Sequence, residues 1–293
     1  MASPATTYRG RIAPSPTGYL HLGHARTFWV AFQRSRRANG QLIFRNEDLD
    51  FLRCKPEFAQ AMIEDLRWLG LDWEEGPDVG GPHAPYIQSQ RRTFFLRAWR
   101  TLRNEGWIYP CSCSRKDLER TRSADAADDD DEIPYRGTCR NEINRARDWE
   151  SPAGVSWRFR VPDGEAISFA DLGAGAQRFV AGKDFTDFLV WRRDDIPSYQ
   201  LAVVADDAEM LITEVVRGAD LLKSTARQLL LLRALNLSAP RYFHCPLVRD
   251  EHHVRLAKRY DSLSLRALRA QGNKPEQLLN KFAAEIDWAA GLE

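Results

Sequence analysis

Strand-like segments alternate with helix-like segments along the first part of the chain. Residues 9–13 (RGRIA) and 41–46 (QLIFRN) are expected to be strands. Between them, residues 21–38 carry apolar side chains at helical spacing and end at Asn39-Gly40, a pair typical of a helix stop. Strands that alternate with helices indicate an α/β fold built on a parallel sheet.

The alternation continues and is then interrupted. Helices are expected over 55–69 and 92–104, and the strand-like sequence WIYPC follows them. From Cys111 to about residue 180 the pattern changes to a cysteine-rich piece, an acidic run and short strands such as VSWRFRV and QRFVA. Alternation resumes with DFLVWR, SYQLAVVAD and LITEVV, followed by a helix from Ala219 to Leu235.

This pattern predicts a core interrupted by a small insertion, which a chain of 293 residues can accommodate. The expected regions are the first half of the core at 1–110, an inserted α+β subdomain at 111–182, the second half of the core at 183–240, and a strand, charged loop and short helices at 241–293. The acidic run 124–132 inside the insertion is interpreted as a solvated loop.

The stretch RIAPSPTGYLHLGH (11–24) places a proline- and glycine-containing loop between the first strand and the first helix. The N-terminus of a helix presents unpaired N–H groups and a positive dipole end, which together can bind an anion such as phosphate. His21 and His24 are three residues apart, so they share one face of the helix. The alternative is a helix cap followed by two surface histidines.

Three of the five cysteines fall between positions 111 and 139. Cys111 and Cys113 bracket one residue, and Tyr135 and Cys139 follow across the acidic run. Three thiolates and one oxygen ligand would complete a closed tetrahedral site for one structural zinc ion. The alternative is three unpaired cysteines in a small insertion. The other two cysteines have no partner in the sequence and are interpreted as structural.

The overall composition restricts the surroundings in which the chain works. The formal net charge of +1 means that any surface for a nucleic acid must be locally basic. No apolar run is long enough to span a membrane, and the start MASPATTYRG has no apolar core for a secretory signal. We therefore expect a cytoplasmic chain with reduced thiols, without a membrane partner and with a monomer as the default state.

With these residues in view, RIAPSPTGYLHLGH resembles the first motif of the class I aminoacyl-tRNA synthetases, in the form that the glutamyl enzymes carry. The stretch RLAKR (255–259) stands where the family has a lysine-bearing loop, although Arg255 and Ala257 depart from the common residues. The resemblance implies a Rossmann-like parallel-sheet catalytic core and an ATP site, with Mg²⁺ accompanying the nucleotide. The residues it implies at that site are His21, Gly23, His24 and Lys258, with His21, His24 and Lys258 as the catalytic ones.

Three further segments match the same family in chain order: FRNEDLD (44–50), PSYQLAVVADD (197–207) and EVVRGADLL (214–222). They imply an L-glutamate pocket formed by Arg11, Ala13, Ser15, Glu47, Tyr199 and Arg217. A carboxylate at Glu47 suits the α-ammonium group, and arginine forks suit the two carboxylates of glutamate. The resemblance also agrees with zinc at the Cys, Cys, Tyr and Cys positions.

The resemblance covers residues 9–265, and the chain stops at Glu293 without room for the anticodon-binding domain of a full glutamyl enzyme. The sequence is similar to one branch of the family in four features. These are the position of its end, His24, the segment EVVRGADLL, and the spacing of Tyr135 and Cys139. That branch activates glutamate with ATP without tRNA and transfers it to the cyclopentenediol of queuosine at the wobble position of tRNA(Asp). We expect this activity, with ATP, L-glutamate and queuosine-containing tRNA(Asp) as partners.

Three other functions fit parts of the pattern. A truncated glutamyl-tRNA synthetase would charge a tRNA 3′ end and would need tRNA for glutamate activation. A synthetase paralogue without chemistry is disfavoured because His21, His24 and Lys258 are all present. A nucleotidyltransferase that shares the HxGH motif is disfavoured by the pocket residues Glu47 and Arg217.

Overall fold

The computed structural model describes residues 7–120, 135–248 and 264–292. The acidic run 124–132 and the degenerate lysine stretch, including Arg255, Ala257 and Lys258, therefore lie outside the described residues. None of the helices within these three ranges is both long and apolar enough to cross a membrane.

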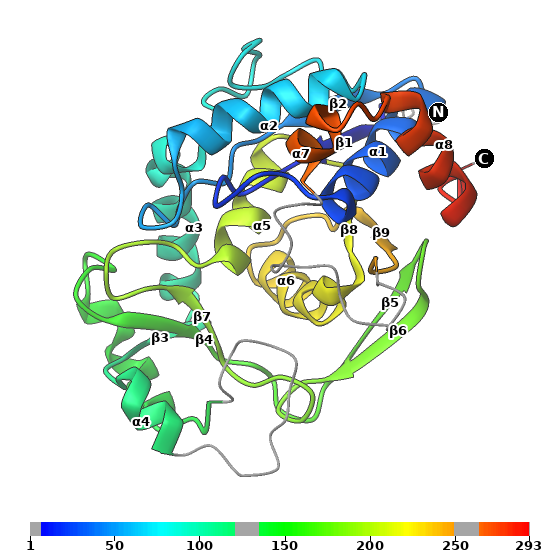
Figure 1. Ribbon diagram of the computed structural model, residues 1–293. Coiled ribbons are helices and arrows are strands. Elements are labelled where there is room, and N and C mark those ends of the chain that lie inside the picture. The colour runs from blue at the N-terminus through cyan, green and yellow to red at the C-terminus, as the bar shows by residue number, and fades with distance from the viewer. Residues whose placement is uncertain (1–6, 121–134, 249–263, 293) are drawn as a thin grey trace.

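Two pairs of parallel strands form the core of the fold (Figure 1). Strand β1 (Arg9–Ile12) pairs in parallel with β2 (Gln41–Phe44), and β8 (Glu214–Gly218) pairs in parallel with β9 (Arg241–Cys245). The two pairs meet where Thr213 N–H donates to Arg9 O at 2.9 Å and the Arg11 guanidinium donates to Val216 O at 2.8 Å. The spatial order is thus β2-β1-β8-β9, which confirms the predicted parallel sheet in this region.

The predicted helices form close to their expected bounds. They are α1 (Leu22–Arg37), α2 (Pro56–Trp68), α3 (Arg92–Asn104) and α6 (Leu222–Ala234). The segment SYQLAVVAD, for which the sequence predicts no specific element, forms a further helix, α5 (Tyr199–Glu209). Helix α1 links β1 to β2, and α6 links β8 to β9. A short 3₁₀ turn, η1 (Gln88–Gln90), precedes α3, and η3 (Ala219–Leu221) opens α6.

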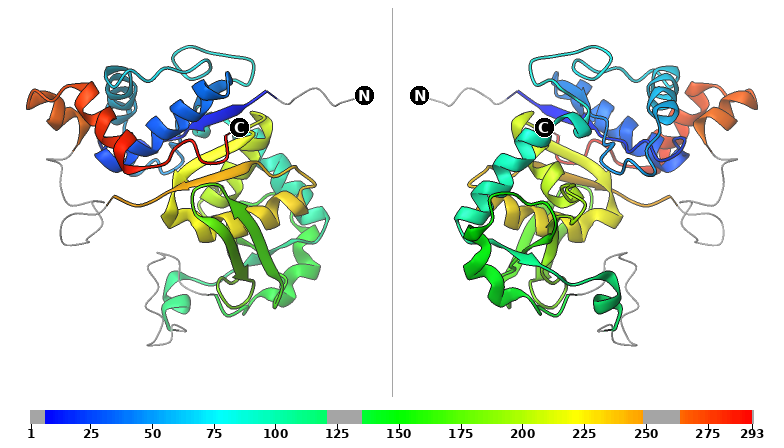
Figure 2. Two further views of the ribbon diagram at one scale, coloured as in Figure 1. Left: turned by 90° about the vertical axis from the view of Figure 1, so that its right-hand side faces the viewer. Right: turned by 90° about the vertical axis from the view of Figure 1, so that its left-hand side faces the viewer.

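Alternate residues of the core strands face opposite layers of helices. Leu42 and Phe44 of β2 join the apolar cluster of α1 and α2, whereas Ile43 between them packs on the opposite side near Met210 and Val215. The two views in Figure 2 show α1 and the C-terminal helices on one side of the core sheet and α6 on the other. Burial on both faces is the usual environment of parallel strands.

A second sheet corrects one expectation. The segments predicted as WIYPC and DFLVWR form β3 (Ile108–Cys111) and β7 (Phe188–Trp191), but both lie in an antiparallel sheet around β4 (Ser156–Phe159). The parallel pairing inferred from simple alternation is therefore wrong for these two strands. The strand between them, β4, contributes Trp157 and Phe159, which pack with Trp191 of β7 and with α3 in a core cluster separate from that of β1 and β2.

A hairpin connects the middle of the chain to the core sheet. Strands β5 (Ala166–Asp171) and β6 (Gly175–Val180) pair antiparallel, and the end of β5 meets β9 where Asp171 lies beside Tyr242. Leu172 N–H donates to Tyr242 O at 2.9 Å. The remaining short elements of this region are α4 (Arg115–Arg120) and the 3₁₀ segment η2 (Arg140–Asp148).

The C-terminal segment packs on α1 through α7 (Leu265–Ala270) and α8 (Pro275–Glu285). Arg34 of α1 is fully buried and donates to the carbonyl oxygens of Trp288 and Ala290, each at 2.8 Å. Its other side forms a bidentate ion pair with the buried carboxylate of Glu214, at 2.6 and 2.9 Å. One guanidinium thus holds helix, sheet and C-terminal segment together.

The Arg34–Glu214 pair gives a test of this arrangement. Replacing Glu214 with Leu should lower the free energy of unfolding by about 3–5 kcal/mol, because Arg34 then keeps a buried charge without its carboxylate. Removing both charges, with Arg34→Met and Glu214→Leu, should cost less than the sum of the single changes. Urea unfolding measures all three, and Asp72→Ala at the exposed Arg36 pair is the control, expected to cost under about 1 kcal/mol. Additive losses would contradict this account.

Candidate active site

The order β2-β1-β8-β9 creates a point where neighbouring connections leave in opposite directions. From β1 the chain crosses through α1 to β2 on one side, and from β8 it crosses through α6 to β9 on the other. In open α/β sheets the crevice beyond the carboxyl ends of two such strands is the usual ligand site. Arg11 near the end of β1 and Arg217 near the end of β8 both lie at this point.

The loop after β1 runs alongside the segment after β2. Arg45 N–H donates to Ile12 O at 2.9 Å, and Glu47 N–H donates to Pro14 O at 3.0 Å. This pairing places Ala13 and Ser15, which flank Pro14, next to Glu47. The structure therefore brings these three residues of the predicted glutamate pocket to one edge of the sheet.

Buried charges fix the direction of Arg11 and Glu47. Arg45, which is fully buried, bonds Glu47 Oε1 at 3.0 Å and Asp207 Oδ1 at 2.8 Å. The same Asp207 oxygen lies 3.6 Å from Arg11 Nε. Burial raises the pKa of Glu47 above its usual value, although the charges of Arg45 and Arg11 oppose that shift.

Tyr199 and Arg217 meet on the opposite side of this crevice. The Arg217 guanidinium donates to the Tyr199 hydroxyl oxygen at 3.3 Å. Arg217 is buried, whereas 38% of Tyr199 is exposed, so the tyrosine lies at the outer side of the site. Removal from water raises the pKa of Tyr199, and the charges of Arg217, Glu47 and Arg11 also act on that pKa. Arg217, Glu47 and Arg11 are therefore close enough to Tyr199 for their charges to act on its hydroxyl.

Sequence reasoning missed the charged residues beneath this pocket. Asp206 accepts bonds from Arg91 Nε at 2.6 Å and Gln88 Nε2 at 2.8 Å, and Asp207 holds Arg45 as described. Both aspartates lie in the segment PSYQLAVVADD, whose match drew attention only to its tyrosine. A pair of acidic residues on an otherwise apolar helix was the available signal.

The histidine pair stands at the start of α1. His21 is the residue that caps the helix, because its Nδ1 accepts the Gly23 N–H at 3.1 Å. The rings of His21 and His24 stack with centroids 3.7 Å apart, although His21 has an extended backbone and precedes the helix rather than lying on its face as expected. A side chain at Gly23 would place its Cβ 3.0 Å from the His21 ring, so the ring would have to shift to keep this cap. His21 therefore caps the helix and stacks on His24 at the same time.

The described chain on both sides of the lysine stretch returns to this same helix end. Leu265 N–H donates to Leu20 O at 2.7 Å, and Ser264 forms a bridge with His21. On the other side, Arg26 of α1 donates to Pro246 O. The two flanks of residues 249–263 therefore both lie at the N-terminus of α1, where the histidines are.

Three sulfur atoms gather at the second predicted site. The Sγ atoms of Cys111, Cys113 and Cys139 all lie within 4.8 Å of one another, with 3.6 Å between those of Cys113 and Cys139. The Tyr135 hydroxyl lies 3.6 Å from Cys111 Sγ and accepts the Cys139 N–H at 2.6 Å. This cluster has the chemistry to hold a metal ion, as the spacing of its residues predicts.

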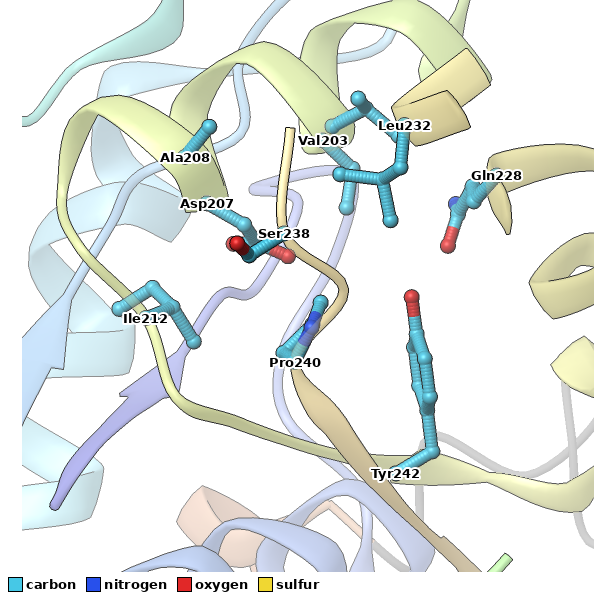
Figure 3. Close-up of a pocket in the computed structure, with 10 residues that line it drawn as sticks. Val203, Asp207, Ala208, Ile212, Gln228, Leu232, Ser238, Pro240 and Tyr242 are labelled. Carbon is cyan, nitrogen blue, oxygen red and sulfur yellow. The ribbon is translucent and has the colours of Figure 1, made fainter. Parts of the chain in front are cut away.

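A small cavity lies beside Asp207, between α5, α6 and β9 (Figure 3). Val203, Asp207, Gln228 and Tyr242 are among the side chains that line it, and its volume is about 20 Å³. That volume holds about one water molecule. The cavity is therefore too small for an amino acid.

Comparison with known proteins agrees with this geometry. Residues 7–287 match the family model described as tRNA synthetases class I (E and Q), catalytic domain. The chain is 49% identical over 277 residues to a protein from Symbiobacterium thermophilum named glutamyl-Q tRNA(Asp) synthetase, which covers 94% of this chain and 85% of that protein. It is 40% identical to a glutamate–tRNA ligase of a Sulfurihydrogenibium species, of which it spans only 58%.

Among solved structures, the chain resembles a glutamate–tRNA synthetase from Elizabethkingia anophelis with a TM-score of 0.76 and 29% identity. The match covers 92% of this chain and 54% of that one. The resemblance therefore extends over nearly all of the described fold.

The role of His21 as a cap can be separated from any other role of its ring. Replacing His21 with Ala should lower the free energy of unfolding by about 1 kcal/mol, because the Gly23 N–H loses its acceptor. His21→Asn supplies another good capping oxygen, so it should stay within about 0.5 kcal/mol of the original chain. Chemical unfolding of the three proteins measures this. Equal losses in both variants would show that the cap contributes nothing.

Proposed function

Because the chain belongs to the class I aminoacyl-tRNA synthetases of the E and Q type, we propose that it activates L-glutamate with ATP and transfers the glutamyl group to queuosine in tRNA(Asp). This is the activity of a glutamyl-queuosine tRNA(Asp) synthetase. The observation that carries the proposal is the convergence of Arg11, Glu47 and Arg217 at the strand ends, a set of charges that complements glutamate. The 49% identity to a protein of that name supports the choice of acceptor.

Each charged group of glutamate has a complementary group in the pocket. Glu47, whose carboxylate Arg45 holds in place, would receive the α-ammonium group. The guanidinium groups of Arg217 and Arg11 would receive the carboxylates. Ala13 and Ser15 would line the same side as Glu47, and the Tyr199 ring would close the outer side of the pocket.

Activation would then require only positioning and charge stabilisation. A glutamate α-carboxylate oxygen attacks the α-phosphorus of ATP, a new O–P bond forms, and the bond to the departing pyrophosphate breaks. His21, Gly23 and His24 at the helix N-terminus would hold the phosphates. Lys258 would neutralise the pyrophosphate, which the placement of its flanking segments beside His21 supports. Mg²⁺ bound with ATP would supply further neutralisation of the phosphates.

Transfer completes the reaction. A hydroxyl of the cyclopentenediol attacks the carbonyl carbon of glutamyl-adenylate, an ester bond forms, and AMP leaves with the electron pair of the broken anhydride bond. The hydroxyl proton passes to solvent. With these substrates we expect the enzyme to work in the cytoplasm, and one copy of the chain contains every residue that the proposal uses.

The second candidate is charging of a tRNA 3′ end, as the glutamate–tRNA ligase relatives are named to do. The two activities differ in whether glutamate activation needs tRNA. ATP–pyrophosphate exchange with glutamate should proceed without tRNA, and labelled glutamate should enter tRNA(Asp) that contains queuosine but not the same tRNA without it. Exchange that strictly requires tRNA(Glu) would overturn the proposal.

Within the same assay, Lys258→Ala should slow adenylate formation by about 100-fold, because one charge that stabilises the departing pyrophosphate is lost. The KM for glutamate should change little. Lys281→Ala on the exposed side of α8 is the matched control and should leave the exchange unchanged. Unchanged exchange in Lys258→Ala would remove this lysine from the mechanism.

We also propose that the sulfur cluster holds one structural zinc ion, with Cys111, Cys113, Tyr135 and Cys139 as its ligands. Zinc–sulfur bonds of about 2.3 Å in a tetrahedron separate the sulfur atoms by about 3.8 Å. The 3.6 Å between Cys113 and Cys139 is close to that value. Four ligands from the protein leave no open position, which suits a structural role rather than catalysis.

Metal analysis of the purified chain tests this. We expect one zinc per chain, and Cys139→Ser should lower both the zinc content and the melting temperature, because metal binding contributes to the folding of small metal-bearing segments. Cys54→Ser, at a cysteine outside the cluster, should change neither quantity. Zinc-free protein of unchanged stability would contradict the assignment.

A further inference from the structure

Arg217 belongs to a row of buried polar side chains that are linked by hydrogen bonds. Arg217 Nε donates to His244 Nε2 at 3.1 Å, and His244 Nδ1 lies 2.5 Å from Asp171 Oδ2. All three residues are at most 4% exposed. Parallel pairing of β8 with β9 sets Arg217 directly beside His244, and the end of β5 brings Asp171 to the same place. The three residues thus come from separate strands.

Arg217 determines which atoms donate and which accept in this row of hydrogen bonds. Arginine nitrogens can only donate, so His244 Nε2 must accept, and the imidazole proton must then lie on Nδ1 and point to Asp171. Burial lowers the pKa of His244, although the Asp171 carboxylate opposes that shift, and the lowered pKa favours the neutral ring of this arrangement. The bond to Asp171 selects the tautomer that Arg217 needs.

The carboxylate of Asp171 is itself fixed by the backbone. Its Oδ1 accepts the N–H groups of Gly173 at 3.0 Å, Ala174 at 2.7 Å and His244 at 3.0 Å. Its Oδ2 is therefore the oxygen that faces His244 Nδ1. Any side chain at position 171 that keeps the three backbone bonds must also present an acceptor at Oδ1.

These contacts determine which part of Arg217 faces the crevice. Besides His244, the guanidinium donates to Thr225 Oγ1 from Nη2 at 2.8 Å and to the Tyr199 hydroxyl from Nη1 at 3.3 Å. Of the five N–H groups of an arginine, three are then assigned among the described residues. One N–H remains on each terminal nitrogen, which is the pair that a carboxylate can bind with both oxygens.

We propose that His244 and Asp171 are positioning residues for substrate recognition, which hold the Arg217 guanidinium so that its two outer N–H groups receive the side-chain carboxylate of glutamate. The proposal rests on the function proposed above, in which Arg217 binds glutamate. Because an amide cannot accept two such bonds, the same pair contributes to the preference for glutamate over glutamine.

Asp171→Asn is the sharpest test, because it is nearly isosteric. The three backbone N–H groups require the amide oxygen at the Oδ1 position, which places the NH₂ group against His244 Nδ1. His244 then carries its proton on Nε2, where it opposes the Arg217 Nε–H and competes with Arg217 Nη2 for Thr225 Oγ1, which lies 3.2 Å from that nitrogen. A merely structural aspartate would tolerate this change, whereas a positioning residue would not.

Glutamate-dependent ATP–pyrophosphate exchange should show the KM for glutamate raised by about tenfold or more in Asp171→Asn, with the KM for ATP unchanged. The preference for glutamate over glutamine should fall. His244→Gln keeps an acceptor for Arg217 and should retain most of the affinity. In that background Asp171→Asn should add little, because no ring tautomer remains to be inverted. Asp65→Asn, a buried carboxylate on α2, is the matched control.

Nitrogen-15 NMR of histidine-labelled protein reads the tautomer of His244 directly. The original chain should carry the proton on Nδ1 and Asp171→Asn should carry it on Nε2, with His244→Gln identifying the signal. An unchanged tautomer, or an unchanged KM for glutamate in a folded Asp171→Asn protein, would overturn the inference and leave the proposed function intact. Absence of glutamate activation in the original chain would reject the proposed function, while the tautomer measurement still decides whether Asp171 orients the ring.

Discussion

The candidate pocket depends on one buried carboxylate, Asp207, which holds two arginines from neighbouring strands. It bonds Arg45 at 2.8 Å and lies 3.6 Å from Arg11. Buried charges lose their hydration, and that loss is offset only when each has a close partner. Arg45 also bonds Glu47, so the positive and negative groups that face the crevice are fixed through shared partners. The pocket is therefore ordered before a ligand arrives, which reduces the entropy lost on binding.

Local elements were predictable from the sequence, but their pairing was not. The helical spacing of apolar residues predicted the full extent of α3, Arg92–Asn104. Such a prediction works because one buried face is a property of consecutive residues. The partners of β3 and β7 depend instead on segments far along the chain. Both strands are short and apolar, as a parallel core strand would also be, so nothing in their own residues shows that β4 lies between them. Alternation therefore predicts the core sheet and misassigns these two strands.

The same distinction applies to the site. Glu47, Tyr199 and Arg217 lie in segments whose order resembles a known family, so the sequence could identify them. Asp171 and His244 are 73 residues apart, and neither belongs to a recognisable spacing. Their relation exists only because the β5–β6 hairpin reaches the edge of the core sheet at β9. Residues that orient a binding group are thus harder to predict than the group itself, since their role depends on three-dimensional contact alone.

Capping of α1 by His21 and the proposed phosphate binding at the same helix end are compatible with one arrangement. The cap uses Nδ1 of His21 as an acceptor, which places the proton of a neutral ring on Nε2. The cap therefore converts the far nitrogen into a donor, the form that a phosphate oxygen requires. Gly23 makes both possible, because its N–H supplies the capping bond and a side chain there would press against the His21 ring. A histidine at this position can therefore stabilise the helix through Nδ1 and serve the proposed anion site through Nε2, the opposite nitrogen of one imidazole.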